Sequence, residues 1–126
     1  MPQDQKKILL VEDDKFLSEM YTTKLTDSGF EVEVSSDGQD ALTKVKEQKP
    51  DLILLDVVLP KMDGFEFLQL LKKDDSTKDI LVIILTNLGQ KEEVEKGLKL
   101  GANDYIIKAH FTPTEVVAKV KKLLNK

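Results

Sequence analysis

Short apolar runs alternate along this chain with longer segments in which apolar residues recur three or four positions apart. The runs at residues 8–11, 52–55 and 80–85 are apolar at every position, which is typical of strands covered on both faces in a parallel sheet. Residues 30–34 instead alternate between apolar and acidic side chains, so we expect a strand with one wet face at an edge of the sheet. The short run at residues 105–107 is expected at the other edge.

The segments between these runs are predicted to be helices, because apolar side chains at this spacing lie on one face of a helix. The stripes are, in chain order, Phe16, Leu17, Met20, Tyr21 and Leu25; Ala41, Leu42 and Val45; Phe65, Leu68 and Leu71; Val94 and Leu98; and Val116, Val117, Val120, Leu123 and Leu124. Alternation of five strands with five helices predicts an α/β domain with a doubly wound parallel sheet.

Residues that begin or end helices flank these stripes. Gly29 and Gly101 are expected to end the first and fourth helices. Asp37 can cap the start of the second helix, and Pro50 limits its end. The last helix has the most complete signal, a capping box with proline at the first helical position: Thr112, Pro113 and Glu115.

Acidic side chains follow two of the predicted strands. Glu12, Asp13 and Asp14 come directly after the first strand, and Asp56 comes after the third. The carboxyl ends of the strands are where doubly wound sheets bind ligands. Four carboxylates at one edge repel one another, which raises their pKa values or favours a bound cation, and an all-oxygen site suits Mg²⁺ better than zinc.

Two further polar residues end the remaining central and edge strands. Thr86 offers a hydroxyl donor after the fourth strand, and Lys108 offers a positive charge after the fifth. Each candidate has an ordinary explanation when taken alone: Asp13 or Asp14 as a helix cap, Thr86 as a strand-end residue and Lys108 as a solvated lysine. Together, at the same end of four strands, they predict a site for a metal ion and a phosphoryl group.

Composition excludes several other kinds of site. The chain has no cysteine, which excludes disulfides, thiolate metal sites and thiol nucleophiles. Its 19 basic and 23 acidic residues give a net charge of −4, so no chain-wide basic field would attract nucleic acid. The single histidine, His110, has no partner at a catalytic spacing and is expected in a loop, and no glycine-rich phosphate loop occurs.

Membrane insertion and secretion are not expected either. No apolar run approaches the ~18 residues of a membrane span. Residues 1–7 are polar and lack the apolar stretch of a secretory signal. We therefore expect a cytoplasmic protein without a membrane partner.

Four segments of the chain resemble the receiver domains of two-component response regulators. They are residues 8–14 (ILLVEDD), residues 54–64 (LLDVVLPKMDG), residues 85–86 (LT) and residues 101–108 (GANDYIIK). Because they occur in order over nearly the whole chain, the resemblance is more specific than any single motif. It implies the flavodoxin-like receiver fold with strand order 2-1-3-4-5, and a single receiver domain over residues 1–126, with a core from about 6 to 124 and no output domain.

The resemblance also implies roles for the residues at the strand ends. Asp56 would be the phosphoacceptor, a carboxylate nucleophile that attacks a phosphohistidine. Mg²⁺ would be held by Asp56 together with Glu12, Asp13 and the backbone carbonyl of Val58. Lys108 would pair with one phosphoryl oxygen of the modified aspartate.

The implied function is a phosphorylation-dependent switch, not an enzyme that turns over a metabolite. Thr86 would move to bind a second phosphoryl oxygen, and Tyr105 would change its packing with it. The phosphoryl donor would be a sensor histidine kinase or a phosphotransfer protein. A downstream protein target would bind the face of the fourth helix, fifth strand and fifth helix, with the chain acting as a monomer or a phosphorylation-dependent dimer.

Three positions depart from the pattern of the family. Receivers usually follow the site lysine with proline, often through a cis bond, but Ala109 stands here, and a cis bond to alanine would cost ~2.5–4 kcal/mol. Asn87 is larger than the usual residue after the switch threonine. Val58 and Leu88, two residues beyond Asp56 and Thr86, are both apolar at positions that flank the route of hydrolytic water, which predicts slow loss of the phosphoryl group.

Three alternative functions are open at this stage. A pseudo-receiver would keep the fold as an interaction module without accepting phosphate, and Ala109 leaves room for that interpretation. A flavodoxin-like electron carrier would share the sheet order, although acidic residues after the first strand would repel a flavin phosphate. A Mg²⁺-dependent phosphatase would use Asp56 as its nucleophile but would need a second acid nearby, which Val57 and Val58 do not supply.

Overall fold

The structure, a computed structural model, describes residues 5–86, 91–110 and 112–124. In chain order its elements are β1 (Lys7–Val11), α1 (Lys15–Asp27), β2 (Glu31–Ser35), α2 (Gly38–Gln48), β3 (Leu52–Asp56), α3 (Gly64–Lys73), β4 (Leu81–Thr86), α4 (Lys91–Lys99), β5 (Asp104–Ile107), a short 3₁₀ helix (Lys108–His110) and α5 (Pro113–Leu124). Each predicted strand and helix is present, with ends within a few residues of those expected.

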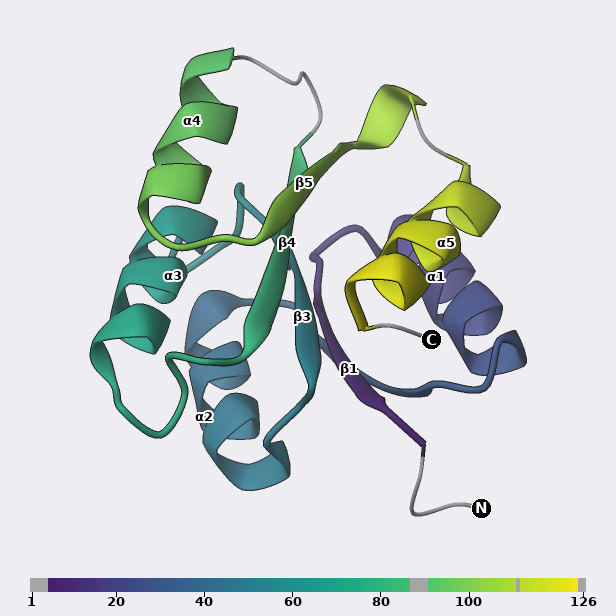
Figure 1. Cartoon of the computed structure of the whole chain (residues 1–126), viewed down its shortest axis with the longest axis horizontal. Coiled ribbons are helices and arrows are strands. Elements are labelled where there is room, and N and C mark those ends of the chain that lie inside the picture. Colours follow the sequence, from purple (N-terminus) through teal and green to yellow (C-terminus); the bar gives the residue numbers. More distant parts are fainter. Residues whose placement is uncertain (1–4, 87–90, 111, 125–126) are drawn as a thin grey trace.

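The strands form one parallel sheet in the order β2-β1-β3-β4-β5. Helices α1 and α5 cover one face of this sheet, and α2, α3 and α4 cover the other (Figure 1). All five residues of β3 are buried, whereas β2 alternates between less and more exposed residues as far as Val34. The continuous and the alternating patterns therefore mark a central and an edge strand, and the doubly wound fold is confirmed.

Aspartates cap the starts of three helices. Asp14, Asp37 and Asp63 each accept a hydrogen bond from the backbone N–H three residues later. The predicted capping box of α5 is present: the Thr112 N–H donates to Glu115 Oε1 at 2.9 Å, and the Glu115 N–H donates to Thr112 Oγ1 at 3.2 Å. The caps of α1 and α3 lie just beyond the strand-end loops that carry candidate site residues.

Two of the predicted apolar faces are partly wrong. Phe16 leaves 70% of its surface exposed, because α1 packs on the sheet through Tyr21 and Leu25. Leu98 is 41% exposed, and Gly97 is the residue of α4 that is buried. A Cβ at position 97 would overlap Ile84 of β4, so the helix backbone itself lies close against the sheet. His110, expected in a loop, ends the short 3₁₀ helix.

The turn after β3 is folded tightly back on the strand end. The Gly64 N–H donates to the Val57 carbonyl at 3.0 Å. A Cβ at Gly64 would lie 2.5 Å from the carbonyl oxygen of Asp56 and 2.6 Å from the Cα of Val57. Only glycine permits this approach, which holds the backbone of Asp56 in place at the edge of the sheet.

Candidate functional site

Four of the predicted site residues lie at one edge of the sheet because its strands are parallel. Glu12 follows β1, Asp56 ends β3, Thr86 ends β4 and Lys108 follows β5. The chain runs from β1 outward to β2 and then returns to β3 on the other side of β1, so the strand order reverses between β1 and β3. A topological switch point of this kind is where doubly wound sheets bind ligands.

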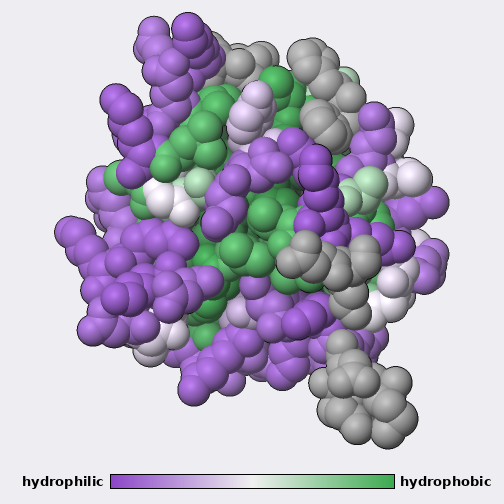
Figure 2. All heavy atoms as spheres, viewed as in Figure 1, coloured by the Kyte–Doolittle hydropathy of each residue, from purple (hydrophilic) through white to green (hydrophobic). Residues whose placement is uncertain are grey.

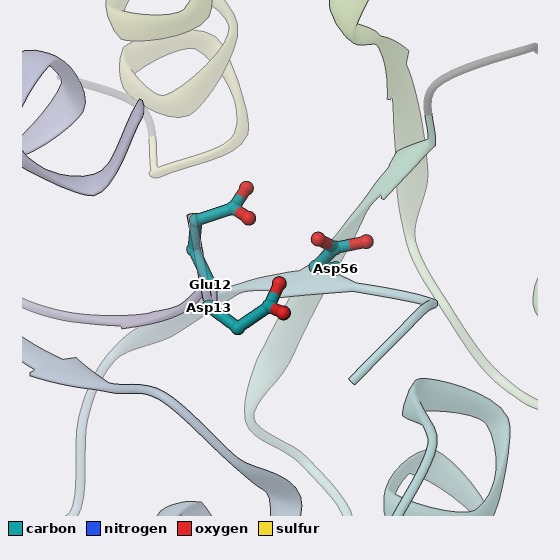
Figure 3. Close-up of side chains that lie close together, drawn as sticks. All are labelled: Glu12, Asp13 and Asp56. Carbon is teal, nitrogen blue, oxygen red and sulfur yellow. The ribbon is translucent and has the colours of Figure 1, made fainter. Parts of the chain in front are cut away.

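Three carboxylates converge at this switch point (Figure 3). An oxygen of Glu12, one of Asp13 and one of Asp56 all lie within 4.8 Å of one another. Glu12 and Asp56 are buried, whereas Asp13 is exposed to solvent. Hard oxygen donors with one open side are the ligands that Mg²⁺ prefers, so the donor set fits this ion.

The fourth carboxylate of the predicted cluster has another role. The side chain of Asp14 accepts a hydrogen bond from the Leu17 N–H at 3.0 Å and caps α1. All four predicted carboxylates line the same cavity, but Asp14 is not one of the three that converge. The sequence left open whether Asp13 or Asp14 caps the first helix, and in the structure the cap is Asp14.

Lys108 lies inside the cluster. Its Nζ is 2.6 Å from Glu12 Oε1 and 2.9 Å from Asp56 Oδ2, and the side chain is 6% exposed. The Lys108–Ala109 peptide bond is trans, so the absence of proline at this position does not keep the lysine out of the site. Burial acts to lower the pKa of Lys108, but the hydrogen bonds to Glu12 and Asp56 outweigh it and raise the pKa above its ordinary value.

Glu12 carries the most strongly shifted carboxyl group of the site. Burial, together with a smaller effect of the neighbouring Asp56, raises its pKa from 4.5 to about 7 against the opposing effect of the hydrogen bond from Lys108. The Asp14 N–H donates to Glu12 Oε2 at 3.1 Å, and the Glu12 N–H donates to the carbonyl of Ser35 at 3.0 Å. The carboxylate is thus held in position although its charge is not fully compensated.

The site opens into a cavity of about 290 Å³ lined by Glu12, Asp13, Asp14, Leu17, Asp56, Val58 and Lys108. The Val58 N–H donates to Asp56 Oδ1 at 3.1 Å, while its side chain is 67% exposed. Both carboxylate oxygens of Asp56 are therefore engaged, one by Val58 and one by Lys108. That the Val58 carbonyl binds a metal ion stays a prediction.

Thr86 and Tyr105 lie on the side of the sheet that faces α4. Thr86 is buried, and its Oγ1 donates to Glu93 Oε1 at 3.3 Å. Tyr105 is half-buried next to Ile84 in the sheet register, and the Nζ of Lys119 lies 5.6 Å from the centre of its ring. Sequence reasoning missed Glu93, because no local pattern says which glutamate of a helix turns towards a strand end. Asn87 and Leu88 lie outside the described residues.

Among the described residues, no helix is long and apolar enough to cross a membrane.

Comparison with known proteins gives consistent results. The family model for the response regulator receiver domain matches residues 8–121. The probable transcriptional regulator ycf27 of Cyanophora paradoxa is 40% identical over 126 residues, which are all of this chain and 51% of that protein. This chain spans about half the length of the curated relatives it matches.

Two solved structures are similar along nearly their whole length. A putative response regulator from Chloroflexus aurantiacus superposes with a TM-score of 0.90 at 33% identity, covering 97% of this chain and 99% of that one. The Mn²⁺-bound form of response regulator Rcp1 superposes with a TM-score of 0.82 at 31% identity, covering 94% of each chain.

In metal-free buffer, we expect the free energy of unfolding to fall as the pH rises from about 5 to about 8. The folded-state pKa of Glu12, about 7, lies above the ordinary value of 4.5. Its proton therefore stabilises the folded state below pH 4.5, and this contribution is lost as the pH rises through 7. We expect a loss on the order of 1–3 kcal/mol, measured by urea unfolding with EDTA present.

Glu12→Gln is the control, since it removes the titrating group and keeps every other one. The fall in stability should be absent in this variant. Equal falls in the two proteins would contradict the assignment of the shifted pKa to Glu12.

Proposed function

This chain belongs to the response regulator receiver domain family, and we propose that it works as a switch controlled by phosphorylation of Asp56. The observation that carries the proposal is the contact of Lys108 with both Glu12 and Asp56 at the edge of the sheet. A buried carboxylate beside a fixed positive charge, at the mouth of a cavity, is the arrangement that an aspartyl phosphate needs.

In the proposed reaction, an Asp56 carboxylate oxygen attacks the phosphorus of a phosphohistidine on a histidine kinase or phosphotransfer protein. The new P–O bond forms as the P–N bond breaks, and the electron pair of that bond stays on the imidazole nitrogen of the donor. Lys108 is already placed beside Oδ2 of Asp56, so its ammonium group can bind an oxygen of the transferred group without a large movement.

We assign the metal site to Glu12, Asp13, Asp56 and the backbone carbonyl of Val58. The convergence of the three carboxylates and the excess of negative charge over the single Lys108 support this assignment. When bound, Mg²⁺ would neutralise part of this charge and that of the phosphoryl oxygens. The similar structure of response regulator Rcp1 is described as its Mn²⁺-bound form, which supports a divalent cation at this site.

The output would be carried by the face of α4, β5 and α5. Thr86 would move to a phosphoryl oxygen, and Tyr105, on the same side of the sheet, would repack behind it. Figure 2 shows hydrophobic surface in the middle of the view, interrupted and surrounded by hydrophilic residues. Leu98 of α4 and Ile107 of β5 are exposed and half-buried, respectively, and would contact a downstream protein or a second copy of the chain.

The relatives in the comparison are named transcriptional regulators, but they are about twice as long as this chain. We propose that the receiver itself does not contact nucleic acid, because its net charge is −4. The relatives that are named as transcriptional regulators contain further sequence beyond the part that matches this chain. We also propose that this receiver works in the cytoplasm.

Incubation with a small acyl phosphate and Mg²⁺ should add one phosphoryl group to the chain, detected by intact-protein mass spectrometry. Asp56→Asn should abolish the adduct, since it removes the nucleophile, and EDTA during loading should prevent it. Asp51→Asn is a matched control, because Asp51 lies at the opposite end of β3, where it accepts a hydrogen bond from the Lys7 N–H. It should load like the wild type.

Other outcomes of this experiment would identify the alternatives. A wild-type chain that takes no phosphoryl group would favour a pseudo-receiver. Steady turnover of a phosphate ester would favour a phosphatase, and a yellow purified protein would favour an electron carrier.

The phosphoryl group on Asp56 should be long-lived, and Val58→Asn should shorten its lifetime. Val58 is exposed beside the acceptor, and an amide in its place can orient a water molecule that the valine cannot. One added hydrogen bond in the transition state corresponds to an increase of about three- to tenfold in the rate of phosphate loss. Val58→Ala makes equal room without a polar group and should leave the rate nearly unchanged; equal acceleration by both variants would contradict this explanation.

A further inference from the structure

The hydroxyl group of Thr86 is directed at a residue of α4. Its Oγ1 donates to Glu93 Oε1 at 3.3 Å, and Thr86 is buried while Glu93 is half-buried. Hydroxyl–carboxylate bonds are usually about 2.5–2.7 Å long, so this bond is long and weak for its type. It joins the end of β4 to the first turn of α4.

In the described conformation, Thr86 donates its hydroxyl proton to an anionic acceptor on α4. The proposed function requires the same proton for a phosphoryl oxygen on Asp56. A hydroxyl group has one proton to donate, so the two acceptors compete for it. Both are anionic, and a phosphoryl oxygen, with its higher charge, is the stronger acceptor.

Two further contacts of helix α4 are found among the described residues. Among the described residues of α4, Gly97 is the one that is buried, and it packs against Ile84 of β4. The Nζ of Lys96 lies 4.6 Å from the centre of the Phe65 ring on α3. Both contacts lie in the second half of the helix, whereas the Thr86–Glu93 bond joins its first turn to the sheet.

From this geometry we propose that Glu93 is a positioning residue that holds Thr86 on α4 until Asp56 is phosphorylated. When the Thr86 hydroxyl donates its hydrogen bond to a phosphoryl oxygen instead, the bond to Glu93 breaks and the first turn of α4 is released. The state of Asp56 is thereby coupled to the helix that borders the proposed partner face. This inference rests on the proposed function and adds to it a restraint that opposes activation.

Glu93→Ala tests the proposal, because it removes the competing acceptor. Phosphorylation of Asp56 by a subsaturating acyl phosphate should become about three- to tenfold faster, the equivalent of one hydrogen bond. Glu92→Ala is the matched control: it removes the same charge from the same turn, but Glu92 is exposed. It should load at the wild-type rate. Glu93→Gln keeps an acceptor oxygen and should stay within about twofold of the wild type.

A double-mutant comparison separates this role from a general effect on helix stability. In a Thr86→Val background there is no hydroxyl proton to compete for, so Glu93→Ala should have no further effect on the rate. Thr86→Ala provides the same comparison if the valine variant does not fold. An effect of Glu93→Ala that persists without the hydroxyl, or that Glu92→Ala reproduces, would overturn the proposal.

The two proposals fail in different ways. If the wild-type chain takes no phosphoryl group, the proposed function falls and the role of Glu93 falls with it. If the wild type is phosphorylated but Glu93→Ala behaves like Glu92→Ala, only the role of Glu93 falls.

Discussion

Two buried carboxylates share one ammonium group at the edge of the sheet, and this unequal charge balance governs the rest of the site. Glu12 and Asp56 each contact the Nζ of Lys108, while Asp13 adds a third negative charge nearby. Burial makes the imbalance costly, as the raised pKa of Glu12 indicates. A site of this kind gains stability from a cation and has a positive group ready for an incoming phosphoryl group.

The fold holds this arrangement from several directions. The parallel register brings the ends of β1 and β3 together, and the Ser35 carbonyl and the Asp14 N–H fix Glu12 between them. Close approach of Gly64 to the backbone of Asp56 fixes the opposite side. Among the described residues of α4, Gly97 is the buried one, and the Thr86–Glu93 bond joins the first turn of this helix to β4.

Much of the fold could be predicted because the signals are local. Continuous apolar runs identified β1, β3 and β4, and the capping box at Thr112 identified the start of α5. The errors occur where tertiary packing decides. Phe16 has the spacing of a core residue but lies outside the contact of α1 with the sheet, and α4 is buried through Gly97, which contributes nothing to an apolar stripe.

For the site, strand ends were enough to predict Glu12, Asp56 and Lys108 as neighbours. The separation of Asp13 from Asp14 and the contact of Glu93 depend on side-chain directions that spacing does not encode.

Titration with Mg²⁺ tests most directly whether the unbalanced carboxylates form one cation site. We expect one Mg²⁺ per wild-type chain by calorimetry, with binding weakened by about tenfold or more in Asp13→Asn, which removes a proposed ligand. Asp14→Asn should bind within about twofold of the wild type, because Asp14 is the cap of α1 and lies outside the carboxylate cluster. Absence of binding to the wild type, or equal losses in the two variants, would contradict a single cation site at these carboxylates.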